Sequence, residues 1–147
     1  QEPQEGKTQL EYNRRYYQEI LDVVKIYKDY SILGHLDVIK RYDKQGEIEF
    51  EKIKDLIEQI FEVVIADGKG IELNTSSRAY KLKSLMPSKE ILKLYHDMGG
   101  KIITIGSDAH NADRIGDCVM ESQKILKDIG FEGIYTFEKM KPEFHKF

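Results

Sequence analysis

The chain has 147 residues, of which 40% are hydrophobic and 33% charged, and its net charge is −3. This composition is typical of one globular domain with a real core. The negative charge gives no electrostatic footprint for nucleic acid or an anionic membrane surface, and no apolar run approaches the ~20 residues of a membrane span. The one cysteine, Cys118, cannot form an internal disulfide, and no signal peptide is recognisable. We therefore expect a cytoplasmic protein that binds neither nucleic acid nor membrane.

The apolar periodicity predicts four helices that alternate with four short strands. In the first helix, Tyr12, Tyr16 and Tyr27 fall on the expected apolar stripe, where we interpret them as core packing, and Thr8 is the expected N-cap. The tail KMKPEFHKF is expected to lie on the surface without regular structure. The predicted helices span 10–29, 50–66, 89–98 and 113–128, and the predicted strands span 31–34, 71–74, 101–105 and 131–137.

Strands that alternate with helices indicate an α/β fold with a parallel sheet. Polar residues occur at or near three predicted strand ends, at His35, Glu72 and Asp108, with separations of 37 and 36 residues. Each separation is one βα unit, so the three positions should lie side by side at the carboxyl end of the sheet. Sites in α/β proteins are built at this end. We therefore expect a ligand site there.

The stretch TIGSDAH places a carboxylate and an imidazole, Asp108 and His110, two residues apart after a strand. Side chains two residues apart in extended chain point the same way, so both could bind one divalent metal ion. His35 ends a parallel strand and could supply a third ligand, in which case the three side chains should converge on one point. The alternative is structural, with Asp108 capping the next turn and His110 bonded to a backbone carbonyl.

Two arginines follow strand ends at equivalent places, 37 residues apart. Arg41 and Arg78 could bind a phosphate group bidentately, or they could lie on a solvated edge. Lys40 and Arg114 are weaker candidates for the same role. Asn74 lies nearer the strand end than Glu72 on the same side of the strand, so we expect Asn74 rather than Glu72 to contact a ligand.

Three motifs occur together in the chain: GHLDVIKRY at 34–42, IELNTSSRAY at 71–80 and ITIGSDAHNADRIGD at 103–117. In combination they resemble the polymerase-and-histidinol-phosphatase (PHP) superfamily, and within it most nearly the bacterial histidinol phosphatases. The resemblance covers nearly the whole chain, from the Tyr-rich first helix to LKDIGF at 126–131. It is specific in combination, because each motif occupies the expected strand end in the expected order.

The resemblance implies a distorted TIM-like (βα)7 barrel with parallel strands that holds two or three divalent metal ions and hydrolyses phosphate esters. His35, Asp108 and His110 would be metal ligands, and Asp108 would also orient the attacking water. Arg41 and Arg78 would hold the substrate phosphate. The implied activity is hydrolysis of histidinol phosphate, a small-molecule phosphate ester, in histidine biosynthesis.

The family's first strand carries an H-x-H pair and is followed by further ligands that these 147 residues lack. A complete barrel needs about 200 residues or more. We therefore expect residues 1–147 to form the C-terminal part of a single PHP domain, with the N-terminal βα units as the missing partner and with little activity in the fragment alone. A non-catalytic fragment or relative that binds metal or phosphate without turnover is the alternative. A nuclease is disfavoured by the net charge.

Overall fold

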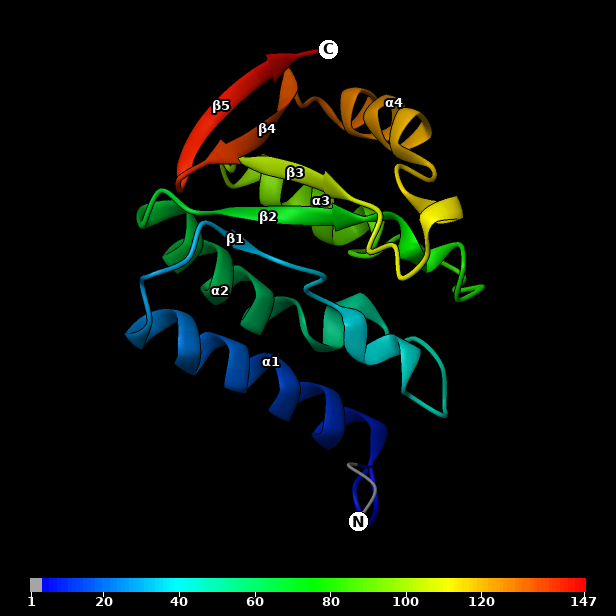
Figure 1. The fold of residues 1–147 in the computed structure, drawn as a ribbon. Coiled ribbons are helices and arrows are strands. Elements are labelled where there is room, and N and C mark those ends of the chain that lie inside the picture. Colours follow the sequence, from blue (N-terminus) through cyan, green and yellow to red (C-terminus); the bar gives the residue numbers. More distant parts are fainter. Residues whose placement is uncertain (1–3) are drawn as a thin grey trace.

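The structure, a computed structural model, describes residues 4–147, which form an α/β fold of helices and two small sheets (Figure 1). In chain order, the helices and strands are α1 (Gln9–Ile26), β1 (Ile32–Leu33), α2 (Lys54–Ala66), β2 (Gly70–Asn74), α3 (Lys89–Asp97), β3 (Ile103–Gly106), α4 (Val119–Ile129), β4 (Gly133–Glu138) and β5 (Lys141–Lys146).

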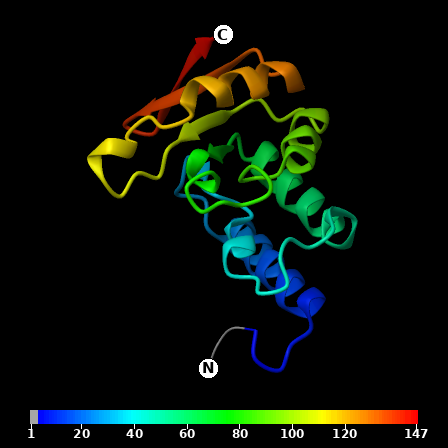
Figure 2. The same ribbon diagram turned by 90° about the vertical axis from the view of Figure 1, so that its right-hand side faces the viewer.

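The central element is a parallel three-stranded sheet in the order β1-β2-β3. Each crossover between neighbouring strands carries a helix, so the strands run in one direction and their carboxyl ends share one edge. The helices α2 and α3 lie behind this sheet in Figure 1, and α1 packs against α2. Figure 2 looks directly at the edge where the three strands end. The predicted parallel α/β architecture is confirmed for these three strands.

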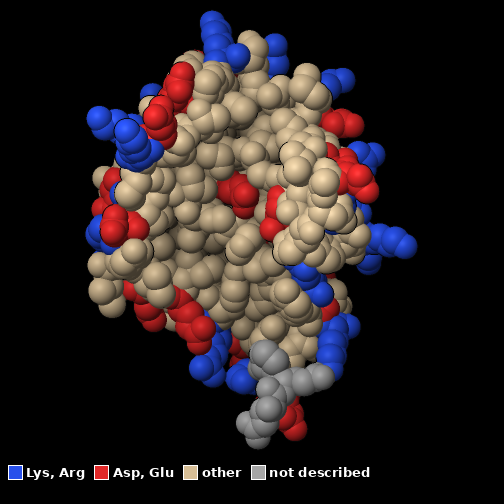
Figure 3. Space-filling view, in the orientation of Figure 1, with Lys and Arg blue, Asp and Glu red and all other residues tan. Residues whose placement is uncertain are grey.

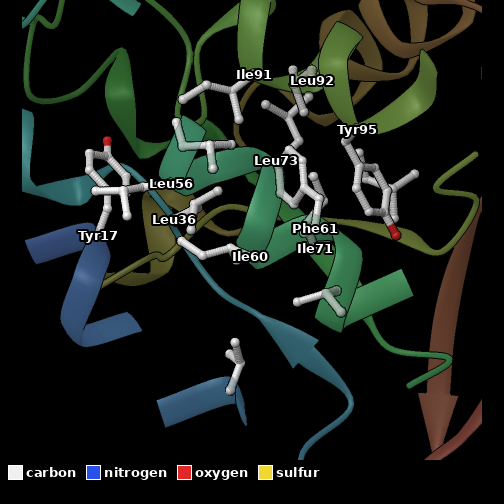
Figure 4. Packing of buried hydrophobic residues seen from close by; sticks show 14 of the residues in the cluster. Tyr17, Leu36, Leu56, Ile60, Phe61, Ile71, Leu73, Ile91, Leu92 and Tyr95 are labelled. Atoms are coloured by element: carbon white, nitrogen blue, oxygen red, sulfur yellow. The ribbon is translucent and has the colours of Figure 1, made fainter. Parts of the chain in front are cut away.

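The core lies between the sheet and α2 and α3 (Figure 4). Ile71 and Leu73 point from β2 toward Phe61 of α2, and all three side chains are fully buried. The ring of Phe61 meets Tyr95 of α3 edge to face, with 5.0 Å between centroids. Burial of such side chains is the main stabilising contribution to the fold.

Side-chain caps fix the N-terminal ends of α1 and α3, and the cap of α1 is the predicted Thr8. Thr8 accepts a hydrogen bond from the Glu11 amide at 3.2 Å, and the Glu11 side chain accepts one from the Thr8 amide at 2.8 Å, which completes a capping box. Ser88 caps α3 through the Ile91 amide. The predicted starts of these two helices, at residues 10 and 89, agree with the observed starts at Gln9 and Lys89 to within one residue.

The predicted apolar stripe of α1 is displaced in the structure. The fully buried residues are Asn13, Tyr17, Leu21 and Val24, whereas Tyr27 is 55% exposed. The side chain of the buried Asn13 donates a hydrogen bond to Asp43 at 2.7 Å. A polar residue therefore occupies the core side of α1, and the apolar pattern alone could not reveal it.

The predicted fourth helix begins later than expected, at Val119 rather than near 113. Residues Ala112–Arg114 form only a short 3₁₀ turn, and Gly116 and Cys118 both have positive φ values, 74° and 59°. Left-handed backbone at these two positions interrupts a right-handed helix. The segment before α4 is therefore a loop.

The C-terminal region corrects two predictions. The last predicted strand, β4, does not extend the parallel ladder but pairs antiparallel with β5, which is formed by the tail that was expected to be irregular. Lys139 and Met140 make the two-residue turn with φ values of 48° and 63°. A turn with two positive φ values matches the strand twist but normally carries Asn or Gly, so this sequence gave no hairpin signal.

Candidate functional site at the carboxyl ends of the strands

The candidate site, called the rim below, comprises the carboxyl ends of β1, β2 and β3 and the loops that follow them (Figure 2). His35 and Asp108 stand in the first turns after β1 and β3 and have positive φ values of 30° and 48°. Non-glycine residues adopt this conformation at an energetic cost, and such residues gather at functional sites. The structure thus brings the predicted strand-end positions to one edge.

Asp108 and His110 are close to each other but do not form a closed metal site. The Nδ1 atom of His110 lies 2.9 Å from the Asp108 carbonyl oxygen and 3.9 Å from its Oδ1 atom, while the imidazole side chain is 73% exposed. The short contact is the backbone bond that the structural alternative foresaw. The Asp108 carboxylate also receives a long hydrogen bond from Ser76, with 3.5 Å between the oxygens.

His35, Asp108 and His110 were predicted to converge on one point. Together they do not form a three-residue metal site in the described part of the chain. Across residues 4–147, no group of three or more His, Cys, Asp and Glu side chains is arranged to hold a metal ion. The donors at the rim fit a divalent cation in chemical kind, because imidazole and carboxylate are its usual ligands. They do not fit it in number, and the ligand roles of these three residues stay predictions.

Glu72 is a rim residue that the sequence analysis ranked below Asn74. Its Oε2 atom accepts hydrogen bonds from the His35 amide at 3.0 Å and from the Asn74 side chain at 3.2 Å. Asn74 is 1% exposed and accepts a bond from the Ser76 amide at 3.0 Å. Asn74 therefore braces Glu72 and the following turn, and its predicted contact with a substrate stays a prediction.

The two predicted phosphate-binding arginines lie in different surroundings. The guanidinium of Arg41 stacks on Tyr80, 3.2 Å from the ring centroid. Arg78 is 70% exposed, and its Nη1 atom donates to Cys118 Sγ at 3.1 Å and lies 3.8 Å from Glu121. The hydrogen bond with Cys118 and the nearby acidic charge raise the pKa of Arg78. Both side chains can offer a fork of donors to an anion.

Lys40 was a weaker phosphate candidate, and the structure corrects this. Its side chain is 6% exposed and forms a 2.9 Å ion pair with Asp37, which is itself buried. The ammonium group also donates to Ser84 and to the Leu85 carbonyl. Burial raises the pKa of Asp37, and Lys40 acts against this rise. Lys40 thus fastens the loop after β1 to the loop before α3 and has no free donor for a ligand.

The face of the sheet next to the rim is open. In the orientation of Figure 1, the space-filling view in Figure 3 shows a hollowed and largely uncharged surface with acidic atoms near its centre and basic groups toward its margin. An open face beside a polar rim is compatible with the entry of a small ligand.

None of the helices within residues 4–147 is long and apolar enough to cross a membrane.

Comparison with known proteins identifies the family of this chain. A family model described as the PHP domain matches residues 1–76, which is more than half of the chain. The chain belongs to the PHP domain family. The predicted resemblance is thereby confirmed, and it includes the segment that carries His35 and Glu72.

Two curated relatives and one solved structure are similar over most of the chain. The Thermotoga maritima protein named "Probable histidinol-phosphatase" is 36% identical over 119 residues, which are 81% of this chain and 49% of the relative. The histidinol-phosphatase of Lactococcus lactis is 30% identical over 95% of this chain and 52% of its own length. The chain therefore spans about half the length of the curated relatives it matches.

The solved structure is a histidinol phosphate phosphatase of Lactococcus lactis in complex with zinc, L-histidinol and phosphate. It superposes with a TM-score of 0.81 and 28% sequence identity, over 97% of this chain and 54% of the other. The similarity supports the α/β fold described here and the assignment to the PHP family.

Proposed function

We propose that this chain is part of a metal-dependent phosphomonoesterase that hydrolyses histidinol phosphate. The observation that carries the proposal is the match along 97% of the chain to a structure solved with zinc, L-histidinol and phosphate. The rim adds independent support, because it presents imidazole, carboxylate and guanidinium groups at the end of a sheet where α/β proteins build their sites.

The proposed architecture is the C-terminal part of a single PHP domain with a distorted TIM-like barrel. The parallel sheet of β1, β2 and β3 would be one arc of the barrel, and its open face would line the interior. The proposal is supported by the curated relatives, of which this chain covers only about half the length. The other ligands would come from N-terminal βα units.

In this proposal, His35, Asp108 and His110 would hold divalent ions, with zinc the first candidate and two or three ions in the complete site. Bound divalent ions neutralise charge on a phosphate group and lower the pKa of bound water. Asp108 would orient the attacking water. Arg41 and Arg78 would bind the phosphate oxygens, and their charge would stabilise the transition state more than the ground state. The contact of Arg78 Nη1 with Cys118 uses one of the five N–H donors of the guanidinium.

The proposal is tested by phosphate release from L-histidinol phosphate, with zinc content measured on the same samples. The complete polypeptide that carries this chain should hydrolyse the substrate, and the 147 residues alone should show little activity. Asp108→Ala should lose both bound zinc and turnover. Asp113→Ala, an exposed carboxylate in the same loop, is the matched control and should behave like the wild type.

Two outcomes would contradict the proposal. A complete polypeptide that binds zinc and phosphate but releases no product would show the non-catalytic alternative. Full zinc content and full rate in Asp108→Ala would show that TIGSDAH is only a strand end and a turn.

A further inference from the structure

The Glu72 carboxylate connects the ends of neighbouring strands on the open face of the sheet. It projects from the middle of β2 and accepts a hydrogen bond from the amide of His35, which stands two residues beyond the end of β1 at Leu33. A hydrogen bond to a carboxylate is charge-assisted and therefore stronger than one between neutral groups. His35 adopts a costly left-handed backbone with φ of 30°, which persists only where surrounding contacts hold it. Glu72 supplies such a contact at the residue predicted to ligate metal.

The sheet leaves space for this carboxylate at two glycines. A Cβ atom placed on Gly106 of β3 would lie 2.0 Å from Glu72 Oε1 and 3.0 Å from its Cδ atom. A Cβ atom on Gly34 would lie 3.5 Å from Glu72 Oε2. Gly106 has no positive φ value, so its backbone does not itself require glycine. The absence of a side chain at 106 therefore serves the position of Glu72.

A series of contacts continues from Glu72 to Asp108. Asn74 donates to Glu72 and accepts the Ser76 amide, and both Asn74 and Ser76 are essentially inaccessible to solvent. The Ser76 hydroxyl then makes the long, 3.5 Å contact with the Asp108 carboxylate. The contacts thus run from the amide of one predicted ligand to the side chain of another, across all three strands.

We infer that Glu72 is a positioning residue of the metal site, which holds the loop of His35 in place and is coupled through Asn74 and Ser76 to Asp108. This inference rests on the proposed function, because it assigns His35 and Asp108 to metal. Partners of this kind orient ligands, and their removal typically lowers metal affinity or activity about 10- to 100-fold.

The test compares zinc affinity and backbone protection. In the complete polypeptide, Glu72→Ala should weaken zinc binding about 10- to 100-fold in competition with a chromophoric chelator. Glu72→Gln keeps one acceptor oxygen and should lose less. In the 147-residue chain without metal, amide hydrogen exchange of His35 should accelerate in Glu72→Ala, while the exchange of core amides stays unchanged. Glu62→Ala, which removes an exposed carboxylate of α2 away from the rim, is the control and should change neither reading.

Gly106→Ala provides a second variant that leaves the carboxylate intact but displaces it. It should reproduce the weaker zinc binding and the faster His35 exchange of Glu72→Ala, with thermal unfolding checked on each sample. The inference is wrong if folded Glu72→Ala binds zinc as tightly as the wild type, or if Gly106→Ala leaves His35 protected. These readings do not use histidinol phosphate, so failure of the proposed hydrolysis is detected separately. A wild-type polypeptide that binds no zinc at all would overturn both proposals.

Discussion

The two faces of the central sheet differ: one is packed with apolar side chains, and the other is open and carries polar groups. The side of β2 that carries Ile71 and Leu73 is covered by α2 and α3, and both side chains are inaccessible to solvent (Figure 4). The opposite side carries Gly70, Glu72 and Asn74, and in Figures 1 and 2 none of the helices of residues 4–147 lies across it. One face thus holds the fold together, and the other keeps polar groups and open space at the rim. Substitutions on the two faces should therefore separate stability from binding.

The largest effect is expected on the packed face. Phe61→Ala removes a fully buried ring that contacts Tyr95 and should lower the free energy of unfolding by about 3–5 kcal/mol, because it loses apolar burial and leaves a cavity. Urea denaturation of the 147-residue chain measures this change. Ile26→Ala, at a residue that is 83% exposed, should change stability by less than about 0.5 kcal/mol. A similar loss in both variants would show that the packed face is not the stabilising one.

The same contrast explains which parts of the fold could be predicted from the sequence. Helix α2 and the strands β1 to β3 follow from apolar periodicity, because their packed sides are apolar without interruption. The predicted helix over 50–66 nevertheless begins four residues late, at Lys54, because Phe50–Lys52 form a separate 3₁₀ turn. Helix α1 buries Asn13 and Tyr17, so the centre of its buried stripe lies one position beyond Tyr12 and Tyr16, which still pack against the core. The β4–β5 hairpin turns at Lys139 and Met140, which carry no turn signal. Prediction failed where tertiary contacts, rather than local pattern, decide the structure.

The site could be predicted in position more than in detail. The spacing of His35, Glu72 and Asp108 placed three strand ends together because parallel strands end at a common edge, and the structure agrees. The bracing role of Glu72 could not be read from its neighbours, since its partner amide belongs to a residue 37 positions away. Burial of Lys40 depends likewise on Asp37 and on the loop before α3.

An intermediate effect is expected at the rim. Arg78→Ala should lower kcat/KM for histidinol phosphate about 10- to 150-fold, which corresponds to the loss of one charge-assisted bond of about 1.5–3 kcal/mol. Zinc content and unfolding free energy should stay near wild type, because Arg78 is exposed and holds no metal in the proposal. Steady-state kinetics of the complete polypeptide, with elemental analysis, makes the comparison.

Variants of Arg41 and Arg15 provide the comparisons for the kinetics of Arg78→Ala. Arg41→Ala should also lower kcat/KM, and Arg41→Lys should restore it only in part because lysine cannot form the planar fork. Arg15→Ala, on the exposed side of α1, should leave the kinetics unchanged. Wild-type kinetics in Arg78→Ala together with a strong loss in Arg41→Ala would place the second phosphate ligand elsewhere in the loop after β2.

The smallest effect is expected away from both faces, at the exposed ion pair between Arg14 of α1 and Asp55 of α2. Both nitrogen–oxygen contacts are 2.8 Å, and Arg14 lowers the pKa of Asp55. A lowered pKa means that the pair stabilises the fold above the unfolded value of ~3.9 and that this contribution is lost as the pH falls through the folded pKa. Because the side chains are 39% and 56% exposed, solvent limits the coupling to about 0.2–1 kcal/mol at neutral pH.

A double-mutant cycle with Arg14→Ala and Asp55→Ala, measured by urea denaturation, tests this coupling. The cycle should give the full coupling energy at neutral pH and almost none at a pH below the folded pKa of Asp55. A coupling that persists unchanged in acid would mean that the contact between α1 and α2 is held by packing of the side-chain stems rather than by charge.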